Sequence, residues 1–211
     1  MAYLNSIGVG SNGVVTMSQA ATATVVANSV NTEVTKFNEL KYFTSITSSK
    51  NGFFAGTSGA CRFLNWTALE EIDISNFTSI GHDSVYGYED TFYGCSSLTK
   101  VTASDKLINI GTYAFRACSS LTTITGLSGN ITLYGPDNFN GCTNLTSDSF
   151  SNVTFSFNNN NSDAFRDCTS LTQIAIDPNN LTIPKETFRG CSNLTTITGL
   201  DNVTIIGNSA F

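Results

Sequence analysis

Charged side chains are scarce in this sequence. Asp, Glu, Lys and Arg together make up 12% of the 211 residues, against roughly 25% in an ordinary soluble domain. Basic residues are fewer than acidic ones, 10 against 16, which gives a net charge of −6. Because nucleic-acid phosphates are bound by clustered Lys and Arg, we expect no nucleic-acid partner. Asn, Thr, Ser and Gly supply the polar surface instead, as is common in proteins that face carbohydrate or the outside of a cell or particle.

Long apolar runs are missing as well. No stretch approaches the ~20 apolar residues that cross a bilayer, so we expect no membrane span. The segment that begins at Met1 has no basic residue before Lys36, which is unlike a secretory signal peptide. If Met1 is the native start, we expect the protein not to leave a cell through such a signal. If a leader was removed, that expectation lapses.

Groups that carry chemistry are equally few. The one histidine, His82, is followed by Asp83 and Ser84, and three adjacent residues do not form a triad, which requires convergence in space. Zinc sites need clustered Cys and His pairs, which the sequence lacks. The oxygen-rich loops at 158–163 and 177–180 lack the spaced acidic ligands of an EF-hand, and turn formation by Asn explains them more simply. We therefore expect no catalytic residue, no metal, no cofactor and no enzymatic activity.

The chain does contain a repeat. A block of about two dozen residues recurs five times, and its copies carry Phe, Cys, Leu and Ile or Val at intervals of three, except that the third copy has Asp in the last place. From one Phe to the next the steps are 23, 24, 26, 23 and 23 residues, the last ending on Phe211. This period predicts a leucine-rich-repeat type of solenoid, in which small units become stable only by stacking. The anchors are Phe92, Cys95, Leu98, Val101; Phe115, Cys118, Leu121, Ile124; Phe139, Cys142, Leu145, Asp148; Phe165, Cys168, Leu171, Ile174; and Phe188, Cys191, Leu194, Ile197.

The pattern within each unit predicts the same local structure. Leu-Thr-x-Ile alternates apolar and polar residues, so the stacked copies should form a parallel sheet along one face. On the opposite side, an apolar pair such as Ile108 and Ile110 leads into Phe-x-x-Cys, for which we expect a short helical or 3-10 turn. Phe should fill the space between the two sides. The equivalent cysteines should form an inward column of reduced thiols, although disulfide bridges stay open as the alternative.

One unit departs from the pattern. Asp148 stands where the other units have Ile or Val, and burying an unpaired carboxylate would cost several kcal/mol. We therefore expect the strand to bulge or shift register, so that Phe150 takes the inward place.

The remaining sequence divides into two parts. Residues 1–36 do not repeat and are predicted to be an N-terminal attachment arm or cap. Residues 37–211 are the repeat region, regular over 92–211 and diverged over 37–91, where Phe54, Cys61, Leu69 and Ile72 echo the anchors at wider spacing. Phe37, Leu40 and Phe43 mark a short amphipathic helical turn. Because the chain ends in mid-repeat, we expect further repeats or a partner to cover that end.

Exposed aromatic residues are candidates for contact with a partner. Tyr86 and Tyr88 lie in an inserted loop over 81–91, and Trp66 is the only tryptophan. Rigid aromatic side chains supply contact area at low entropy cost and stack on sugars. The alternative for Trp66 is a place in the core of an irregular unit.

The repeat resembles the BspA-like leucine-rich repeats, whose units read approximately Ile-Gly-x-x-Ala-Phe-x-x-Cys-Ser-x-Leu-Thr-x-Ile. The segment from Ile110 to Ile124 matches at nearly every marked place, and Ile206-Gly-Asn-Ser-Ala-Phe211 repeats its first half. The match is strong over 92–211 and weak over 37–91. Members of that family are typically surface proteins of Bacteroidetes and some parasites, implicated in adhesion, and similar arrays are found in structural proteins of phages.

The resemblance implies a non-enzymatic structural or binding protein. Together with the missing signal peptide and the unrelated N-terminal arm, it favours a solenoid displayed on the surface of a phage virion, as a fibre, decoration or host-adhesion protein anchored through residues 1–36. The alternative is a bacterial cell-surface adhesin, located outside the cell, that binds a host protein or glycan. The expected partners are other virion or surface proteins, a host-surface protein or glycan, and further copies of the chain.

Overall fold

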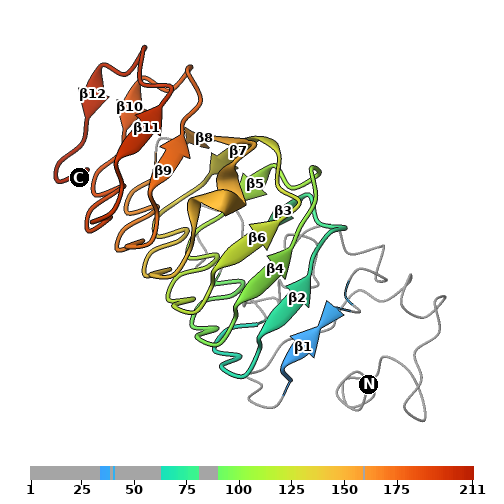
Figure 1. The fold of residues 1–211 in the computed structure, drawn as a ribbon. Helices are drawn as coiled ribbons and strands as arrows, with labels where there is room; N and C mark the ends of the chain where they lie inside the picture. Colours follow the sequence, from blue (N-terminus) through green and yellow to red (C-terminus); the bar gives the residue numbers. More distant parts are fainter. Residues whose placement is uncertain (1–33, 39, 41–62, 81–89, 159) are drawn as a thin grey trace, which may run out of the picture.

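The chain folds as a stack of similar coils. The structure is a computed structural model that describes residues 34–38, 40, 63–80, 90–158 and 160–211. The coils follow one another along a single axis, with β1 at one end and β12 at the other (Figure 1). This arrangement confirms the predicted solenoid, and the sheets that line it are parallel throughout the described residues.

The first column of strands is formed by the Leu-Thr-x-Ile segments. It contains β1 (Lys36–Phe37), β2 (Glu71–Asp73), β4 (Lys100–Thr102) and β6 (Thr123–Thr125), hydrogen-bonded in that order. Ile72, Val101 and Ile124 are in register, so the last anchor of each unit forms one inward row. Farther along the stack, β9 (Gln173–Ala175) and β11 (Thr196–Thr198) form a separate pair. The predicted sheet is therefore present, but it is interrupted.

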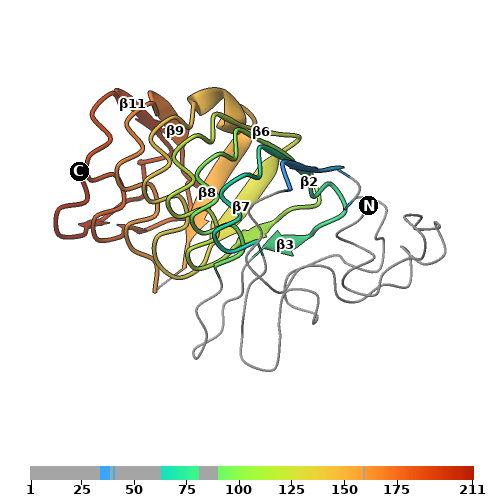
Figure 2. The same cartoon turned by 90° about the horizontal axis from the view of Figure 1, so that it is seen from below.

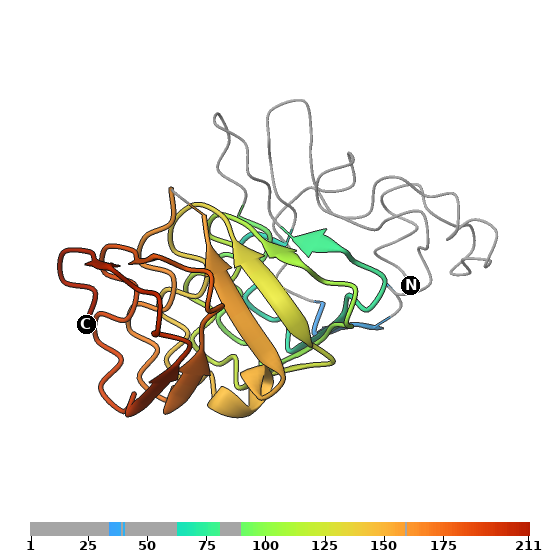
Figure 3. The ribbon, with the colours of Figure 1, turned by 90° about the horizontal axis from the view of Figure 1, so that it is seen from above.

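A second column lies on a different side of the coils (Figures 2 and 3). It contains β3 (Ser79–Ile80), β5 (Asn109–Ile110), β7 (Gly129–Leu133) and β8 (Val153–Phe157). β10 (Thr182–Ile183) and β12 (Ile205–Ile206) form a further parallel pair. The apolar pairs that precede each Phe-x-x-Cys segment thus form strands too, and the coil carries a sheet on two sides rather than one.

Phenylalanine fills the interior, as predicted. The six rings from Phe63 to Phe188 are at most 2% exposed, and Phe211 continues the row. Neighbouring rings are stacked within 23° of parallel, with centroids 5.2 to 5.8 Å apart, which places each ring over that of the adjacent coil. The stacked row is Phe63, Phe92, Phe115, Phe139, Phe165, Phe188 and Phe211.

The Phe-x-x-Cys segments differ from the expected helical or 3-10 turn. Around four of the described Phe anchors, the residues two before and two after the Phe have positive φ, for example Tyr113 at 55° and Ala117 at 60° around Phe115. A right-handed helix cannot include residues in the left-handed region. The segments are therefore successive tight turns. The 3-10 conformation occurs elsewhere, at Asn38 and Leu40 and in η2 (Ser147–Phe150).

In the diverged region, one unit has other anchors than those predicted. Phe63, Trp66, Leu69 and Ile72 keep the regular spacing of three, and all four are buried. Phe63 stacks on Phe92 and Ile72 pairs with Val101, so the anchors of this unit are Phe63 and Trp66 rather than Phe54 and Cys61. The long insertion before Phe92 obscured this register. Phe43, Phe54 and Cys61 lie outside the described residues.

Candidate binding site

The first strand column is broken by η2, in the unit that contains Asp148. The side chain of Asp148 is exposed on this 3-10 turn, whereas Phe150 is buried and packs edge to face against Phe139 and Phe155. The predicted inward place of Phe150 is confirmed. The predicted bulge or register shift is wrong, because the strand is replaced outright by a short helix that turns the carboxylate outward.

Two serine hydroxyls of η2 take over hydrogen bonds that a strand would have made. Ser147 Oγ accepts from the main-chain N–H groups of Thr172 and Gln173, both at 2.9 Å. On the other side, Ser149 Oγ accepts from Ile124 N–H at 2.9 Å. Both serines are less than 8% exposed. The edges of β6 and β9 that face η2 are therefore partly satisfied by side chains instead of by a neighbouring strand.

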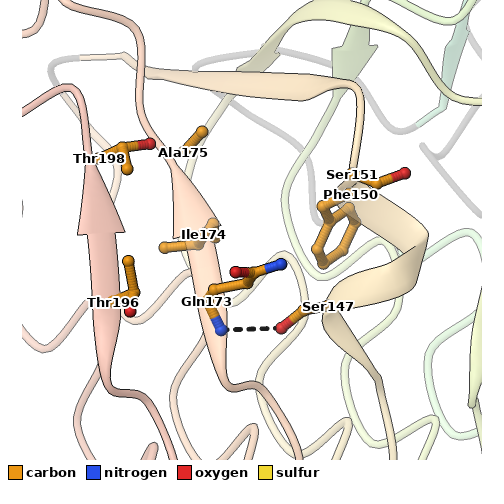
Figure 4. A pocket seen from close by; sticks show the side chains of 8 residues that line it. All are labelled: Ser147, Phe150, Ser151, Gln173, Ile174, Ala175, Thr196 and Thr198. Carbon is orange, nitrogen blue, oxygen red and sulfur yellow. Dashed lines mark hydrogen bonds between the residues drawn. The ribbon is translucent and has the colours of Figure 1, made fainter.

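A notch opens between η2, β9 and β11 (Figure 4). Its volume is about 200 Å³. Ile174 and Phe150, each 4% exposed, form its apolar floor, and Ala175 has the smallest side chain in the wall. The remaining lining is polar and uncharged. The lining residues are Ser147, Phe150, Ser151, Gln173, Ile174, Ala175, Thr196 and Thr198.

A second hollow lies at the other end of the same strand column and is charged. Glu71, Asp73 and Lys100 line it, together with Asn38 and Thr102. Lys36 donates a hydrogen bond to Glu71 at 2.6 Å, which lowers the pKa of Glu71 and raises that of Lys36. The face of the column thus changes from charged near β2 to uncharged near β9.

The turns around the Phe-x-x-Cys segments hold most of the other described charges. Glu186 accepts from Arg189 and Arg166, each at 2.8 Å, and pairs with Lys185 at 3.1 Å. The hydrogen bonds from Arg189 and then Lys185 lower the pKa of Glu186 to about 2. Arg116 lies over the ring of Tyr113 and pairs with Asp137 at 3.4 Å. Arg166 and Arg116 thus pair with carboxylates of the next coil, whereas Arg189 and Lys185 contact Glu186 within the same turn, and both kinds of contact stabilise the framework.

The described thiols are held inside the stack. Each Sγ donates to the main-chain carbonyl of the anchor Phe in the preceding coil, at 2.9 to 3.2 Å. Burial raises the pKa of Cys95 to about 12 and that of Cys191 to about 11. A thiol with a raised pKa is a poor nucleophile, because the thiolate is the reactive form. All five described cysteines are free, which confirms the expectation of reduced packing thiols for Cys95, Cys118, Cys142, Cys168 and Cys191.

Trp66 does not have the predicted role of a partner contact. It is fully buried, stacks on Phe37 with centroids 6.5 Å apart and meets Phe63 edge to face at 4.8 Å. It occupies the place that cysteine has in the other units, so the alternative of a core residue is the correct one. Tyr86 and Tyr88 lie outside the described residues, as does the segment from His82 to Ser84, and the contact role of the two tyrosines stays a prediction.

The oxygen-rich loops are turns. Asp177 Oδ1 accepts from the N–H of Asn179 at 2.8 Å, which is the main reason that the pKa of Asp177 is lowered. Asn158 Oδ1 accepts from Asn160 N–H in the same way. Within the described ranges, no group of three His, Cys, Asp or Glu side chains could hold a metal ion. In the same part of the chain, no helix has the length and apolar character to cross a membrane.

Sequence reasoning missed the notch. Two features of the sequence point toward it. Asp148 is flanked by Ser147 and Ser149, and Ala175 stands at a position where other strands of the column have Thr102, Thr125 or Thr198. Neither reveals by itself that an entire strand is missing.

Comparison with known proteins gives a family match and several structural matches. The model of the family described as the BspA type leucine rich repeat region matches residues 87–211, in 6 copies. No curated protein matches the chain. A leucine-rich repeat protein of T. pallidum is 24% identical, with a TM-score of 0.53, over 69% of this chain and 64% of that protein.

Two further solved structures are less similar in shape. A leucine-rich cell surface protein from Faecalibacterium prausnitzii A2-165 is 25% identical over 68% of this chain and 34% of its own, with a TM-score of 0.44. For a leucine-rich repeat protein from Bacteroides ovatus ATCC 8483 the identity is 19%, the shares are 71% and 66%, and the TM-score is 0.28. The chain spans less than two thirds of the first two proteins. The likeness to the T. pallidum protein shows the fold.

Proposed function

Because the chain belongs to the BspA-type leucine-rich repeat family, we propose that it is a non-enzymatic binding protein whose repeat body is displayed on a surface. The observation that carries this proposal is the outward face of the first strand column. Its strands β6, β9 and β11 present uncharged polar side chains on a rigid parallel framework, and the carboxylate of Asp148 is exposed on η2 between β6 and β9. The side chains of these strands are Thr123, Thr125, Gln173, Thr196 and Thr198. Solenoids use such extended faces to bind partners.

The described thiols and many charged side chains of the turns are engaged in the framework, which supports the same proposal. The thiols donate to main-chain carbonyls in the core, and the charged side chains of the turns pair with one another. On β6, β9 and β11, the hydroxyl and amide groups of Thr and Gln side chains remain available. Such groups bind by hydrogen bonding.

The site of display that we propose is the phage virion, where the chain would serve as a fibre, decoration or host-adhesion protein. Residues 1–36 would be the attachment arm, since their sequence does not follow the repeat and the described stack begins at β1 (Lys36–Phe37). The repeat body would then face outward toward a host-surface protein or glycan.

Mass spectrometry of purified phage particles and of the bacterial envelope from the same culture tests this assignment. We expect peptides of this chain in the particles, at a fixed ratio to the major structural protein. A variant without residues 1–33 should keep the repeat fold by circular dichroism and be missing from the particles. Recovery of the full chain in the envelope and not in particles would instead identify a bacterial cell-surface adhesin.

A further inference from the structure

We propose that the notch between η2, β9 and β11 is a subsite for one neutral saccharide unit. The inference rests on the proposed binding function and names the class of ligand that this part of the surface would take. Four observations support it: the polar groups that face the notch, its lack of charge, its size and the position of η2.

The first observation is a set of polar groups left without partners. Main-chain groups of successive residues in a strand point to opposite sides. Ile176, directly after β9, donates its N–H to Thr198 O of β11, so the main-chain groups of Ile174 also point to β11. Gln173 C=O and Ala175 N–H therefore point to the notch. Neither has a partner among the hydrogen bonds of the described residues, and the same holds for the side chains of Ser151, Gln173, Thr196 and Thr198. Donors and acceptors therefore surround one small space, which suits hydroxyl groups because each can both donate and accept.

The second observation is the absence of charge. The described residues that line the notch have no ionisable side chain. The hollow at the other end of the same column is lined by Glu71, Asp73 and Lys100. A charged ligand would lose hydration in the notch without gaining a counter-ion, so a neutral ligand is favoured.

The third observation is size. About 200 Å³ is less than the ~300 Å³ at which pockets for drug-sized ligands begin, and it leaves room for one ring rather than a chain. The apolar floor of Phe150 and Ile174 can pack against the C–H face of a sugar ring, while its hydroxyls meet Gln173, Thr196 and Thr198 on the wall (Figure 4).

The fourth observation disfavours an extended peptide. A peptide that pairs with the β9 edge would need the N–H of Gln173 as well as that of Ala175. Ser147 Oγ already accepts from Gln173 N–H, and η2 occupies the space beside it. A saccharide unit needs only the two main-chain groups of this edge that η2 leaves open, Gln173 C=O and Ala175 N–H.

Nuclear magnetic resonance titration of the full-length protein tests the proposal. The probes are methyl glycosides of glucose, galactose, mannose and N-acetylglucosamine, with glucuronic acid as a charged comparator. We expect at least one neutral glycoside to shift the amide signals of Gln173, Ala175 and Thr198, with a Kd on the order of millimolar. Glucuronic acid should bind more weakly.

Two variants locate the site. Ala175→Tyr fills the notch with an outward side chain and should weaken binding by about tenfold or more, which corresponds to ~1.4 kcal/mol. The matched control is Thr102→Tyr, at the equivalent outward position of β4, which should bind as the wild type does. If Ala175→Tyr disturbs the fold, Thr198→Val removes one hydroxyl at nearly constant shape and should still weaken binding.

Three results would overturn the saccharide subsite. The first is the absence of shifts at these amides with every neutral glycoside up to about 100-fold the expected Kd. The second is equal binding by wild type, Ala175→Tyr and Thr198→Val. The third is binding of N-acetyl-trialanine amide, an extended peptide, in place of the sugars. None of these results would affect the localisation experiment, so a failure of the subsite is distinguishable from a failure of the proposed function.

Discussion

At the scale of single residues, the cysteine column shows why one residue type recurs in one place. Cysteine is small enough to lie beside the stacked rings, and its S–H reaches the carbonyl of the anchor Phe one coil back, as Cys118 does with Phe92 at 3.0 Å. That carbonyl also accepts from the N–H of Cys95 in its own unit, so the thiol supplies its second hydrogen bond. Alanine could not donate this hydrogen bond, and in the unit of Phe63 the same place is taken by the fully buried Trp66.

The thiols predict an alkaline limit to stability. Burial raises the pKa of Cys95, Cys118, Cys142 and Cys168 in the folded state, whereas an unfolded thiol titrates near pH 8.5. Stabilisation by the protonated thiols is complete below pH 8.5 and is lost as the pH rises toward the folded-state values. Between pH 7 and pH 9.5 we expect a loss of about 1.4 kcal/mol for each thiol, or ~6 kcal/mol for the four.

Urea unfolding under reducing conditions at pH 7, 8.5 and 9.5 measures this loss. A Cys142→Ala variant, although less stable at pH 7, should lose about 1.4 kcal/mol less than the wild type over the same range. Equal free energies of unfolding at pH 7 and pH 9.5 would contradict the prediction.

At the scale of elements, η2 shows how one residue can change the structure of a whole segment. In the other described repeat units an apolar residue points inward from the middle of the strand, but the exposed carboxylate of Asp148 cannot. The 3-10 turn exposes it, brings Phe150 inward and replaces strand hydrogen bonds by the hydroxyls of Ser147 and Ser149. The sheet is divided as a result, and the notch forms at the division.

Removing these hydroxyls should destabilise the protein. Ser147→Ala leaves the N–H groups of Thr172 and Gln173 without an acceptor, and Ser149→Ala does the same to Ile124. We expect each substitution to lower the free energy of unfolding by about 1–3 kcal/mol. Chemical denaturation measures the change. The control is Ser151→Ala, which alters an exposed serine of the same segment and should change stability by less than ~0.5 kcal/mol. A similar small effect for all three variants would show that η2 does not depend on these bonds.

At the scale of the whole molecule, each coil is stabilised only by the coils on either side. The Phe rings stack in sequence, and hydrogen bonds between coils run from each unit to the next, as from Phe115 N–H to Asn138 O and from Phe139 N–H to Ala164 O. Stability in such an array is approximately a sum over units and their interfaces. A substitution that destabilises one unit should therefore reduce the stability of the adjacent units more than that of distant ones.

Phe139→Ala tests this behaviour. The substitution removes a fully buried ring that stacks on Phe115 and Phe165, and we expect a loss of about 3–5 kcal/mol. Hydrogen exchange followed by mass spectrometry should show the largest acceleration in η2 and β8 of the same unit and in the adjacent β6, β7 and β9, and a smaller one in β2. Uniform acceleration across all described strands would instead indicate a single cooperative unit.

The sequence by itself determined the repeat, its anchors, the inward Phe row, the free thiols and the parallel first strand column. These features follow from local spacing and from the burial that stacking imposes on every copy. They can therefore be inferred for one unit and applied to the others. The inward place of Phe150 was predictable for the same reason, because the cost of burying the carboxylate of Asp148 depends only on the residue and its place in the pattern.

Only the tertiary structure decided the second strand column, the left-handed turns around each Phe, the place of Trp66 and the notch. Short apolar pairs do not reveal their partners until neighbouring coils supply the hydrogen bonds. The long insertion before Phe92 made the spacing from Phe63 and Trp66 to the regular units irregular, so the sequence did not show that these two residues stack as anchors. The notch exists because η2 leaves groups on a different coil, at Gln173 and Ala175, without a neighbouring strand. That relation joins residues about 26 positions apart, and only the stacking of the coils brings them together.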